Sequence, residues 1–567
     1  MLQWKCDFVK QKEDVMSNKK TFKGKMKNVV LAALALTTVA NVCVVSTACG
    51  GGRAVDWSKT QFQVGNFNGG YGQAWIEEAA RIFETRYEGV PFEEGKTGVQ
   101  IWVTPGKEEY QGYEFYTKIA GMPQDFYVAP QPRQEIINDK LLITLNDIMD
   151  ESMEEFGENK TIRQKLSGWY KDSYLIEDVA TQGEAPIYFL PTAEAYFGNI
   201  VYDIDLFETK SHYLKEGSGW TNGAANDKAL GMDGVKGTYD DGLPTSEREF
   251  FALLDRIVGK GDVPFTWAGQ YPAYMNAFVF NLFCNYDDGL GQELYNTLRG
   301  EYTFPGDSEP TVFNGYNIVD AQRLPGRLAA LKVGQKIVEN TDYDTDNAFK
   351  DTQSHTQAQT EFLRSVENEN RIAMLIEGSW WENEASARFE EMVWEFNNPN
   401  YAKNTRRLGL MPTIRPNGAI GTKTSFITSA QALFINGNTK HVKLAKKFMK
   451  FLLSNEIREL FTGTTGCASP YEYTLSKETH DSLTSFGKCL WEVHQNKDNM
   501  YVFKTEHRTS AAYMVNPSYY PHNFSMNATT SVPFEAFRTG VDAETYFTGM
   551  QTYAQAQYDE YFKKYVE

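Results

Sequence analysis

An alternation of strand-like and helix-like segments constrains the fold of this chain more than any other feature. Residues 62–66 have the apolar pattern of a strand, and the glycine-containing turn 68–70 follows. Apolar residues then recur at helical spacing on one face of 71–87, and 99–103 has the pattern of a second strand. Strand, helix and strand at this spacing predict a right-handed βαβ unit, and therefore parallel strands in a sheet.

The alternation continues along the chain and predicts the α/β fold class. Ser246 is expected to cap a helix, and the glycine-rich stretch 208–242 is expected to be an insertion on the surface. The 567 residues exceed what one hydrophobic core organises, so at least two lobes are expected. Further strands are predicted at 187–190, 200–202, 372–376 and 430–435, and further helices at 245–258, 441–461 and 543–565.

The N-terminal region has the order of segments found in secretory signals. Lysines at 19–27 precede an apolar run at 29–40, and small residues follow it. The apolar run is too short and too interrupted to be a stable membrane span. Residues 1–48 are therefore predicted to be a signal peptide, with Met16 as an alternative start.

Cys49 lies directly after the small residues and before three glycines. This arrangement resembles the lipobox of bacterial lipoproteins, although Ser46 stands where leucine is usual. Cleavage and acylation at Cys49 would leave 49–58 as a lipid-anchored tether on the extracellular face of the cytoplasmic membrane. The alternative is an ordinary secreted protein with a free N-terminal cysteine.

The charge balance bears on the class of partner. The net charge is −18 and aromatic residues make up 14% of the chain. A strongly acidic chain argues against binding of nucleic acid or of an anionic membrane surface. Abundant aromatic residues in a hydrophilic chain suit a protein that presents flat apolar faces at a wet site.

Cysteine and histidine usage indicates no metal or other cofactor. After the signal region only Cys284, Cys467 and Cys489 remain, so no disulfide scaffold is expected, and pairing of the last two stays open. The seven histidines are scattered without zinc-ligand spacing. The acids of 342–346 resemble the start of a calcium loop, but Asn347 replaces the required glycine, which favours a solvated acidic loop.

Four stretches resemble, in the same order, landmarks of the extracellular solute-binding protein family that includes maltose-binding protein. Asp203 stands where the family usually has asparagine, Asn370 replaces a usual glycine, and Gln124 separates a usual Pro-Asp pair. The resemblance extends from Gln61 to the C-terminus. The four stretches are NFNGGYGQAW (66–75), GMPQDFYVAPQPR (121–133), IYFLPTAEAYFGNIVYDIDLF (187–207) and ENRIAMLIEGSWW (369–381).

The resemblance implies a two-lobed, periplasmic-binding-protein-like fold. Each lobe would be a mainly parallel sheet flanked by helices, and the chain would cross the hinge between the lobes three times. One lobe would comprise 59–193 and about 414–468, and the other about 194–413 and 469–567. The implied function is that of a monomeric lipoprotein of an ABC import system. Such a protein captures a carbohydrate, here expected to be an oligosaccharide, in the cleft between the lobes and delivers it to the permease subunits.

Trp380 is the leading candidate for ligand contact. It follows the predicted strand 372–376, at the carboxyl end where open α/β sheets bind ligands, and it matches the family's sugar-stacking tryptophan. One of the adjacent Trp380 and Trp381 is expected to pack inward, and Trp267 and Tyr274 are assigned to the core or the wall. Each further candidate has a purely structural role as its alternative; these candidates are Asn66, Phe67, Asn68, Tyr71, Gln131, Arg133, Glu194, Gln270 and Tyr271.

Two rival functions stay open at the level of sequence. A surface glycoside-active enzyme would need two carboxylates across a cleft, but no nucleophile elbow, metal motif or P-loop appears in the sequence. A lipoprotein that senses its ligand and signals to a receptor kinase would share the fold. Neighbouring permease genes would favour import, and a lone sensor-kinase gene would favour signalling. The identity of the sugar and its number of units are likewise open.

Overall fold

The structure is a computed structural model of the chain. The predicted signal peptide, Cys49, Gln131 and Arg133 lie outside the residues it describes. The described residues are 53–130, 140–168, 170–171, 175, 177–178, 183–297, 300–313, 318–428, 431–496, 500–502, 526–527, 529–530 and 532–562.

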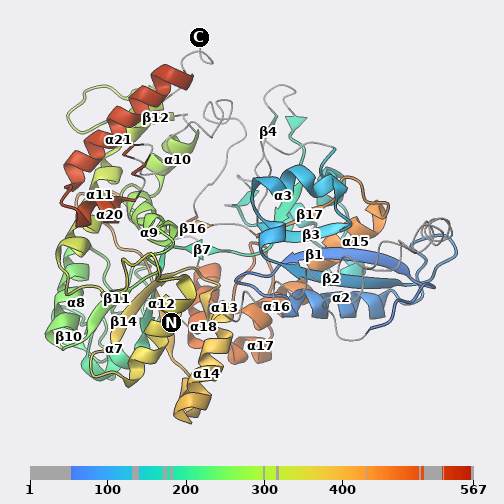
Figure 1. Cartoon of the computed structure of the whole chain (residues 1–567), viewed down its shortest axis with the longest axis horizontal. Coiled ribbons are helices and arrows are strands. Elements are labelled where there is room, and N and C mark those ends of the chain that lie inside the picture. The colour runs from blue at the N-terminus through green and yellow to red at the C-terminus, as the bar shows by residue number, and fades with distance from the viewer. Residues whose placement is uncertain are drawn as a thin grey trace, which may run out of the picture. The chain divides into compact units, whose positions relative to one another are not determined.

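The first lobe is built on a five-stranded sheet with the order β2-β1-β3-β17-β6. Helix α2 (Ala74–Arg86) connects the parallel strands β1 and β2 and packs on them, so the predicted βαβ unit is confirmed (Figure 1). Helices α15 (Val442–Leu452) and α16 (Asn455–Thr465) continue the helical layer against the sheet and α2. The strands are β1 (Thr60–Phe67), β2 (Val99–Gly106), β3 (Phe126–Pro130), β6 (Phe189–Pro191) and β17 (Gln431–Ile435).

The second lobe is built on a four-stranded sheet with the order β11-β14-β8-β15. Strand β11 is parallel to β14, and β8 is antiparallel to both of its neighbours. The strands of both sheets fall within the segments predicted for the two lobes, although the boundary residues stay predictions. The strands are β8 (Asn199–Asp203), β11 (Val263–Thr266), β14 (Ile372–Glu377) and β15 (Leu408–Met411).

Each of these sheets is mainly parallel, as predicted, with one reversed strand. In the first sheet β17 alone runs against the other strands, and in the second sheet β8 does. Both reversed strands are the first strand that the chain forms after it leaves the other sheet. The remaining strands are reached through helices within their own lobe, and such crossovers produce parallel strands.

Short strands lie, in chain order, between the two large sheets. Strand β7 (Tyr196–Phe197) follows β6 and precedes β8, and β16 (Thr424–Thr428) follows β15 and precedes β17. These two strands pair antiparallel, and β18 (Met500–Val502) adds to β16 in parallel. Two connections between the lobes are therefore hydrogen-bonded to one another.

Alternate residues of the second sheet belong to different cores, as expected from the pleat of a strand. Val201, Leu375 and Leu408 face the core that also contains the first sheet. Ile200 and Met374 face a second core. Both faces of the second sheet are therefore buried. The helices that supply the second core are α8 (Glu247–Gly259), α9 (Ala273–Cys284), α11 (Pro325–Glu339), α20 (Pro533–Arg538) and α21 (Ala543–Gln557).

The ends of two predicted helices can be compared with the structure, and one prediction is right and the other wrong. Ser246 caps α8 with a capping box to Glu249, as expected. The single helix predicted at 441–461 is wrong, because α15 (Val442–Leu452) ends and α16 (Asn455–Thr465) begins after an extended Ser454. Serine and asparagine favour helix caps over helix interiors, which explains the break. The helix predicted at 543–565 continues from α21 as a π-helical turn (Tyr558–Phe562).

Asp203, where the family usually has asparagine, serves two purposes at the end of β8. Its side chain accepts a hydrogen bond from the backbone amide of Leu206 and so caps helix α7 (Ile204–Lys210). The same carboxylate forms ion pairs with Arg371 and Arg406. Asparagine would preserve the cap but remove the carboxylate that both guanidinium groups share, leaving Arg406 only its pair with Asp205 at 3.8 Å.

The glycine-rich insertion packs on the second lobe. The guanidinium of Arg256 on α8 stacks on Trp220 at 4.8 Å, and Lys228 lies 3.4 Å from the ring centre of Tyr213. The backbone amide of Tyr239 donates to the carboxylate of Glu492. The insertion consists largely of turns and bends, with one short hairpin formed by β9 (Tyr213–Leu214) and β10 (Trp220–Thr221).

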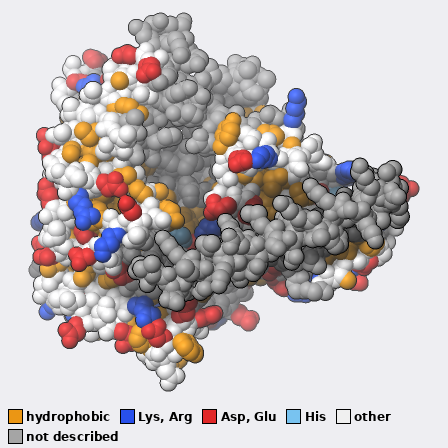
Figure 2. All heavy atoms as spheres, in the orientation of Figure 1, with side chains coloured by type: hydrophobic (Ala, Val, Ile, Leu, Met, Phe, Trp, Pro, Cys, Tyr) orange, Lys and Arg blue, Asp and Glu red, His pale blue; other side chains and the backbone are white. Residues whose placement is uncertain are grey.

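The three cysteines of the described residues are all in the thiol form. Cys284, Cys467 and Cys489 are buried and free, so the open disulfide between the last two is not formed. Acidic and basic side chains are interspersed on the face drawn in Figure 2. No helix within the described part of the chain is long and apolar enough to cross a membrane.

Candidate functional site

A cavity of about 440 Å³ is lined by residues of both lobes. It opens at the carboxyl ends of β1, β2, β3 and β14, where open α/β sheets bind their ligands. The first lobe contributes Phe67, Gly69, Gly70, Tyr71, Lys107, Glu108, Gln111, Pro130 and Gln431. The second lobe contributes Tyr271, Ala273, Tyr274, His355, Trp380 and Glu384.

Aromatic rings form one wall of this cavity. The indole of Trp380 lies 6.4 Å from the ring of Tyr71, edge to face, and 5.6 Å from the ring of Phe197. Neighbouring Trp381 is fully buried and packs edge-on against Phe362, so the two tryptophans point in opposite directions. The prediction that one of the two tryptophans packs inward is confirmed, and that residue is Trp381.

The loop after β1 lies directly against Trp380. A Cβ atom on Gly70 would stand 2.2 Å from Cδ1 of the indole, so only glycine fits there. The side-chain amide of Asn383 donates to the carbonyl of Gly70 at 2.9 Å. A first-lobe loop and a second-lobe loop are therefore in contact at the wall of the cavity.

The loop that carries Trp380 is also bound to the connection between the lobes. The backbone amide of Ser379 donates to the carbonyl of Tyr196 in β7 at 2.7 Å. The amide of Tyr196 donates in return to the Ser379 hydroxyl at 3.0 Å. These reciprocal hydrogen bonds fix the position of Trp380 relative to β7.

Charged groups line the same cavity as Trp380. Oε1 of Glu384 lies 3.4 Å from Nε2 of His355 and 3.9 Å from the ammonium of Lys107. Its other oxygen accepts a hydrogen bond from the amide of Gln359 at 3.2 Å. Burial alone would raise the pKa of Glu384, but these partners, His355 foremost, hold it below its usual value.

A second carboxyl group, that of Glu377, is linked to Glu384 through Gln359 and is absent from the described lining of the cavity. The same amide of Gln359 donates to Glu377 at 3.0 Å, and the backbone amide of Gly378 donates to its other oxygen. Complete burial and the negative charge of Glu384 raise the pKa of Glu377 to about 8. At neutral pH the negative charge of this pair therefore resides on Glu384, at the cavity.

The predicted contact residues divide into two groups. Trp380, Phe67, Tyr71 and Tyr271 line the cavity, and the ring of Tyr271 lies 5.5 Å from that of His355. Asn66, Asn68, Glu194 and Gln270 are absent from its described lining. Whether the first group binds ligand stays a prediction.

The residues away from the cavity have structural partners. Buried Asn66 donates to the carbonyl of Gly72, and buried Glu194 accepts from Tyr196 and lies 3.0 Å from His494. The side chains of Asn68 and Gln270 are exposed, and their backbone amides bind the carbonyls of Gly106 and Gln353. These contacts fit the structural alternative for each residue.

Sequence reasoning missed several lining residues. Lys107, Glu108 and Gln111 follow β2, so the rule that identified Gln131 and Arg133 beyond β3 would also have found them. Tyr274, assigned to the core or wall, lines the cavity with its largely buried ring. No local pattern pointed to Glu384 or to His355 on helix α12 (His355–Arg364), because only tertiary packing brings them together.

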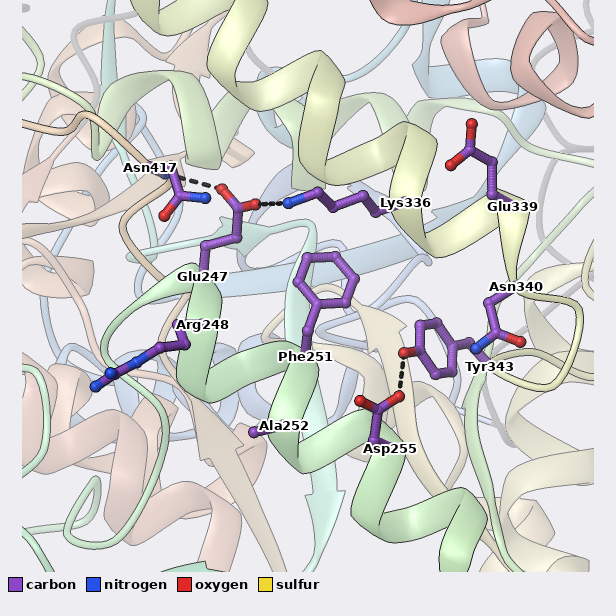
Figure 3. Close-up of a pocket in the computed structure, with 10 residues that line it drawn as sticks. All are labelled: Glu247, Arg248, Phe251, Ala252, Asp255, Lys336, Glu339, Asn340, Tyr343 and Asn417. Atoms are coloured by element: carbon purple, nitrogen blue, oxygen red, sulfur yellow. Dashed lines mark hydrogen bonds and ion pairs between the residues drawn. The ribbon is translucent and has the colours of Figure 1, made fainter. Parts of the chain in front are cut away.

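A larger, open groove of about 600 Å³ lies away from this cavity, mainly on the second lobe (Figure 3). Its walls come mainly from α8 and α11, with Phe251 at the centre. The carboxylate of Glu247 is already paired with Lys336 and with the backbone amide of Asn417. Polar groups that line the groove thus already bind one another, so the cavity between the lobes is the stronger candidate site.

Metal binding has no support from the described residues, which contain no cluster of three His, Cys, Asp or Glu side chains suited to hold an ion. The cavity between the lobes presents aromatic faces, side-chain amides and the charged groups around Glu384.

Ionisation of Glu377 predicts a pH dependence of stability. Its pKa is about 8 in the folded chain and near 4.5 when unfolded, so the folded state retains a proton that the unfolded state releases. The associated stabilisation is complete below about pH 4.5 and is lost as the pH rises through 8. Urea unfolding at pH 5 to 8 should show a smaller decline in the free energy of unfolding for Glu377→Gln than for the parent chain. Equal declines would contradict the assignment.

The comparisons with known proteins agree with this architecture. The sequence model of the family described as bacterial extracellular solute-binding protein matches residues 72–459. The solved structure of the solute-binding protein RafE in complex with raffinose is 17% identical, with a TM-score of 0.52, over 88% of this chain and 100% of that one. Apo RafE from Streptococcus pneumoniae is 17% identical, with a TM-score of 0.54, over 89% and 100%.

A chitin oligosaccharide binding protein is 14% identical, with a TM-score of 0.54, over 89% of this chain and 100% of that one. At these identities the likeness shows the two-lobed fold. No curated protein matches the sequence. The family model covers well over half of the chain. The chain therefore belongs to the bacterial extracellular solute-binding proteins, a family of binding proteins and not of enzymes.

Proposed function

We propose that this chain captures an oligosaccharide outside a bacterial cell and delivers it to an ABC importer. The observation that carries the proposal is the cavity between the lobes, where aromatic rings and polar side chains meet. A sugar offers an apolar C–H face on each ring and hydroxyl groups around its edge. A site for it must therefore supply flat apolar surfaces next to hydrogen-bonding groups.

The cavity supplies both kinds of surface. Trp380, Tyr71, Tyr271 and Tyr274 provide aromatic area, worth on the order of 0.5–1.5 kcal/mol per well-placed aromatic contact beyond burial. The amide side chains of Gln111 and Gln431 and the charged groups around Glu384 provide donors and acceptors. These matter because each buried hydroxyl left unpaired would cost roughly 1–3 kcal/mol.

Binding between two lobes gives the importer a state to recognise. A ligand that contacts Phe67 on one lobe and Tyr271 on the other stabilises the closed arrangement over the open one. The connections that would flex are β7 and β16, which are short and paired with each other. The Ser379–Tyr196 hydrogen bonds place Trp380 next to β7, so ligand contact and hinge are adjacent.

The solved structures support a carbohydrate as the class of ligand. RafE is described with raffinose, and another neighbour in fold is described as a binder of chitin oligosaccharides. Both are distant from this chain, so the sugar itself is not inferred from them. A cavity of about 440 Å³ is large enough for more than one sugar ring, which favours an oligosaccharide.

Anchoring through Cys49 would keep the binding protein near its permease. The lipobox-like sequence and the signal-like segment before it support this part of the proposal. Metabolic labelling with an alkynyl palmitate analogue in a bacterial host should label the parent chain and not Cys49→Ser, which should also appear in the culture medium. Label retained by the variant would reject acylation at Cys49.

Replacement of Trp380 by alanine tests the proposed binding site. The loss of its stacking face should weaken binding of a sugar identified by a glycan array at least tenfold, measured by isothermal titration calorimetry. The matched control is Trp394→Ala, which removes an indole that is 86% exposed and outside the cavity. Unchanged affinity in the Trp380 variant would remove this residue from the site.

A further inference from the structure

Glu384 and Trp380 lie on the same side of one short helical turn. Helix α13 (Trp381–Glu384) begins directly after Trp380, and the backbone amide of Glu384 donates to the carbonyl of Trp380 at 3.1 Å. Both side chains line the cavity. A spacing of four residues on a helix places two side chains next to each other. A carboxylate therefore stands beside the aromatic face on which a sugar ring would stack.

The surroundings of Glu384 determine which proton donors it still accepts. One hydrogen bond comes from Gln359, and His355 and Lys107 approach the other oxygen at 3.4 and 3.9 Å. A carboxylate has about four acceptor positions, so these contacts leave capacity for donors in the cavity. The side chain is 15% exposed, and that exposure is toward the cavity it lines.

The pair formed by Glu377 and Glu384 holds one negative charge at neutral pH. Gln359 bridges the two carboxyl groups, and Glu377 behind the wall is the member that retains its proton. The charge is thus directed to the oxygen atoms at the cavity. Lys107 and His355 both approach the Glu384 carboxylate, whereas the other carboxylate of the described lining, that of Glu108, accepts a hydrogen bond from Gln111.

We propose that Glu384 is a specificity-determining residue, which accepts hydrogen bonds from the hydroxyls of a neutral sugar unit stacked on Trp380 and rejects a unit that carries a carboxylate. This assignment rests on the proposed function and narrows its ligand class to neutral oligosaccharides. Hydroxyl groups donate to an ionised carboxylate in short, charge-assisted hydrogen bonds. A uronate at the same place would bring two anions together in a partly desolvated site, where repulsion is strong.

Matched pairs of trisaccharides test the assignment on the unmodified mature chain. The probes are cellotriose with its triglucuronate counterpart, β-1,4-mannotriose with trimannuronate, and α-1,4-galactotriose with trigalacturonate. Calorimetry at pH 7 should detect binding of at least one neutral trisaccharide, with its uronate partner at least tenfold weaker. A uronate that binds as tightly as its neutral partner, or more tightly, would overturn the role of Glu384 and leave the proposed function standing. Absence of binding in both series would overturn both.

Substitution of Glu384 tests whether this side chain is the cause of the preference for neutral over uronate trisaccharides. Glu384→Gln keeps the shape of the side chain but removes its charge, so the ratio of uronate to neutral affinity should rise at least fivefold. Glu339→Gln is the matched control, because this exposed glutamate lies on α11 outside the cavity between the lobes. Melting temperatures establish that both variants fold. A ratio that is the same in the folded Glu384 variant and in the control would reject the assignment.

Discussion

The contact between the Trp380 loop, the glycine turn of the first lobe and the connecting strand β7 is the constraint on which the site depends. Gly70 admits the indole because it has no Cβ, and Asn383 holds the same turn by a hydrogen bond. Ser379 fixes the loop to Tyr196 by two reciprocal hydrogen bonds. One loop thereby connects the ligand wall, the opposite lobe and the segment between the lobes.

The architecture could be predicted because it depends on local patterns. Alternation of apolar residues gave the βαβ unit of 62–103, and the Ser246 cap follows from its side-chain chemistry. The place of Trp380 after strand β14 and the family resemblance singled it out for the cavity wall, which it lines, while its neighbour Trp381 is buried. The helix predicted at 441–461 failed because the apolar periodicity continued through Ser454, whose preference for a cap interrupted the helix.

The polar half of the site could not be predicted in the same way. His355, Gln359 and Glu384 come from two helices that are distant from Lys107 in sequence, and their arrangement exists only after the lobes fold. Glu194, predicted as a ligand contact near the crossing between the lobes, pairs with buried His494 and is absent from the described lining of the cavity. Position along a strand therefore located the cavity, while burial and tertiary partners determined which side chains face it.

The central claim is that two lobes close on a ligand about the paired connections β7 and β16. Small-angle X-ray scattering of the mature chain, with and without a saturating trisaccharide whose binding is established by calorimetry, tests this claim most directly. Closure predicts a smaller radius of gyration and a shorter maximum dimension when the sugar is bound. Superimposable scattering profiles at full occupancy would contradict it.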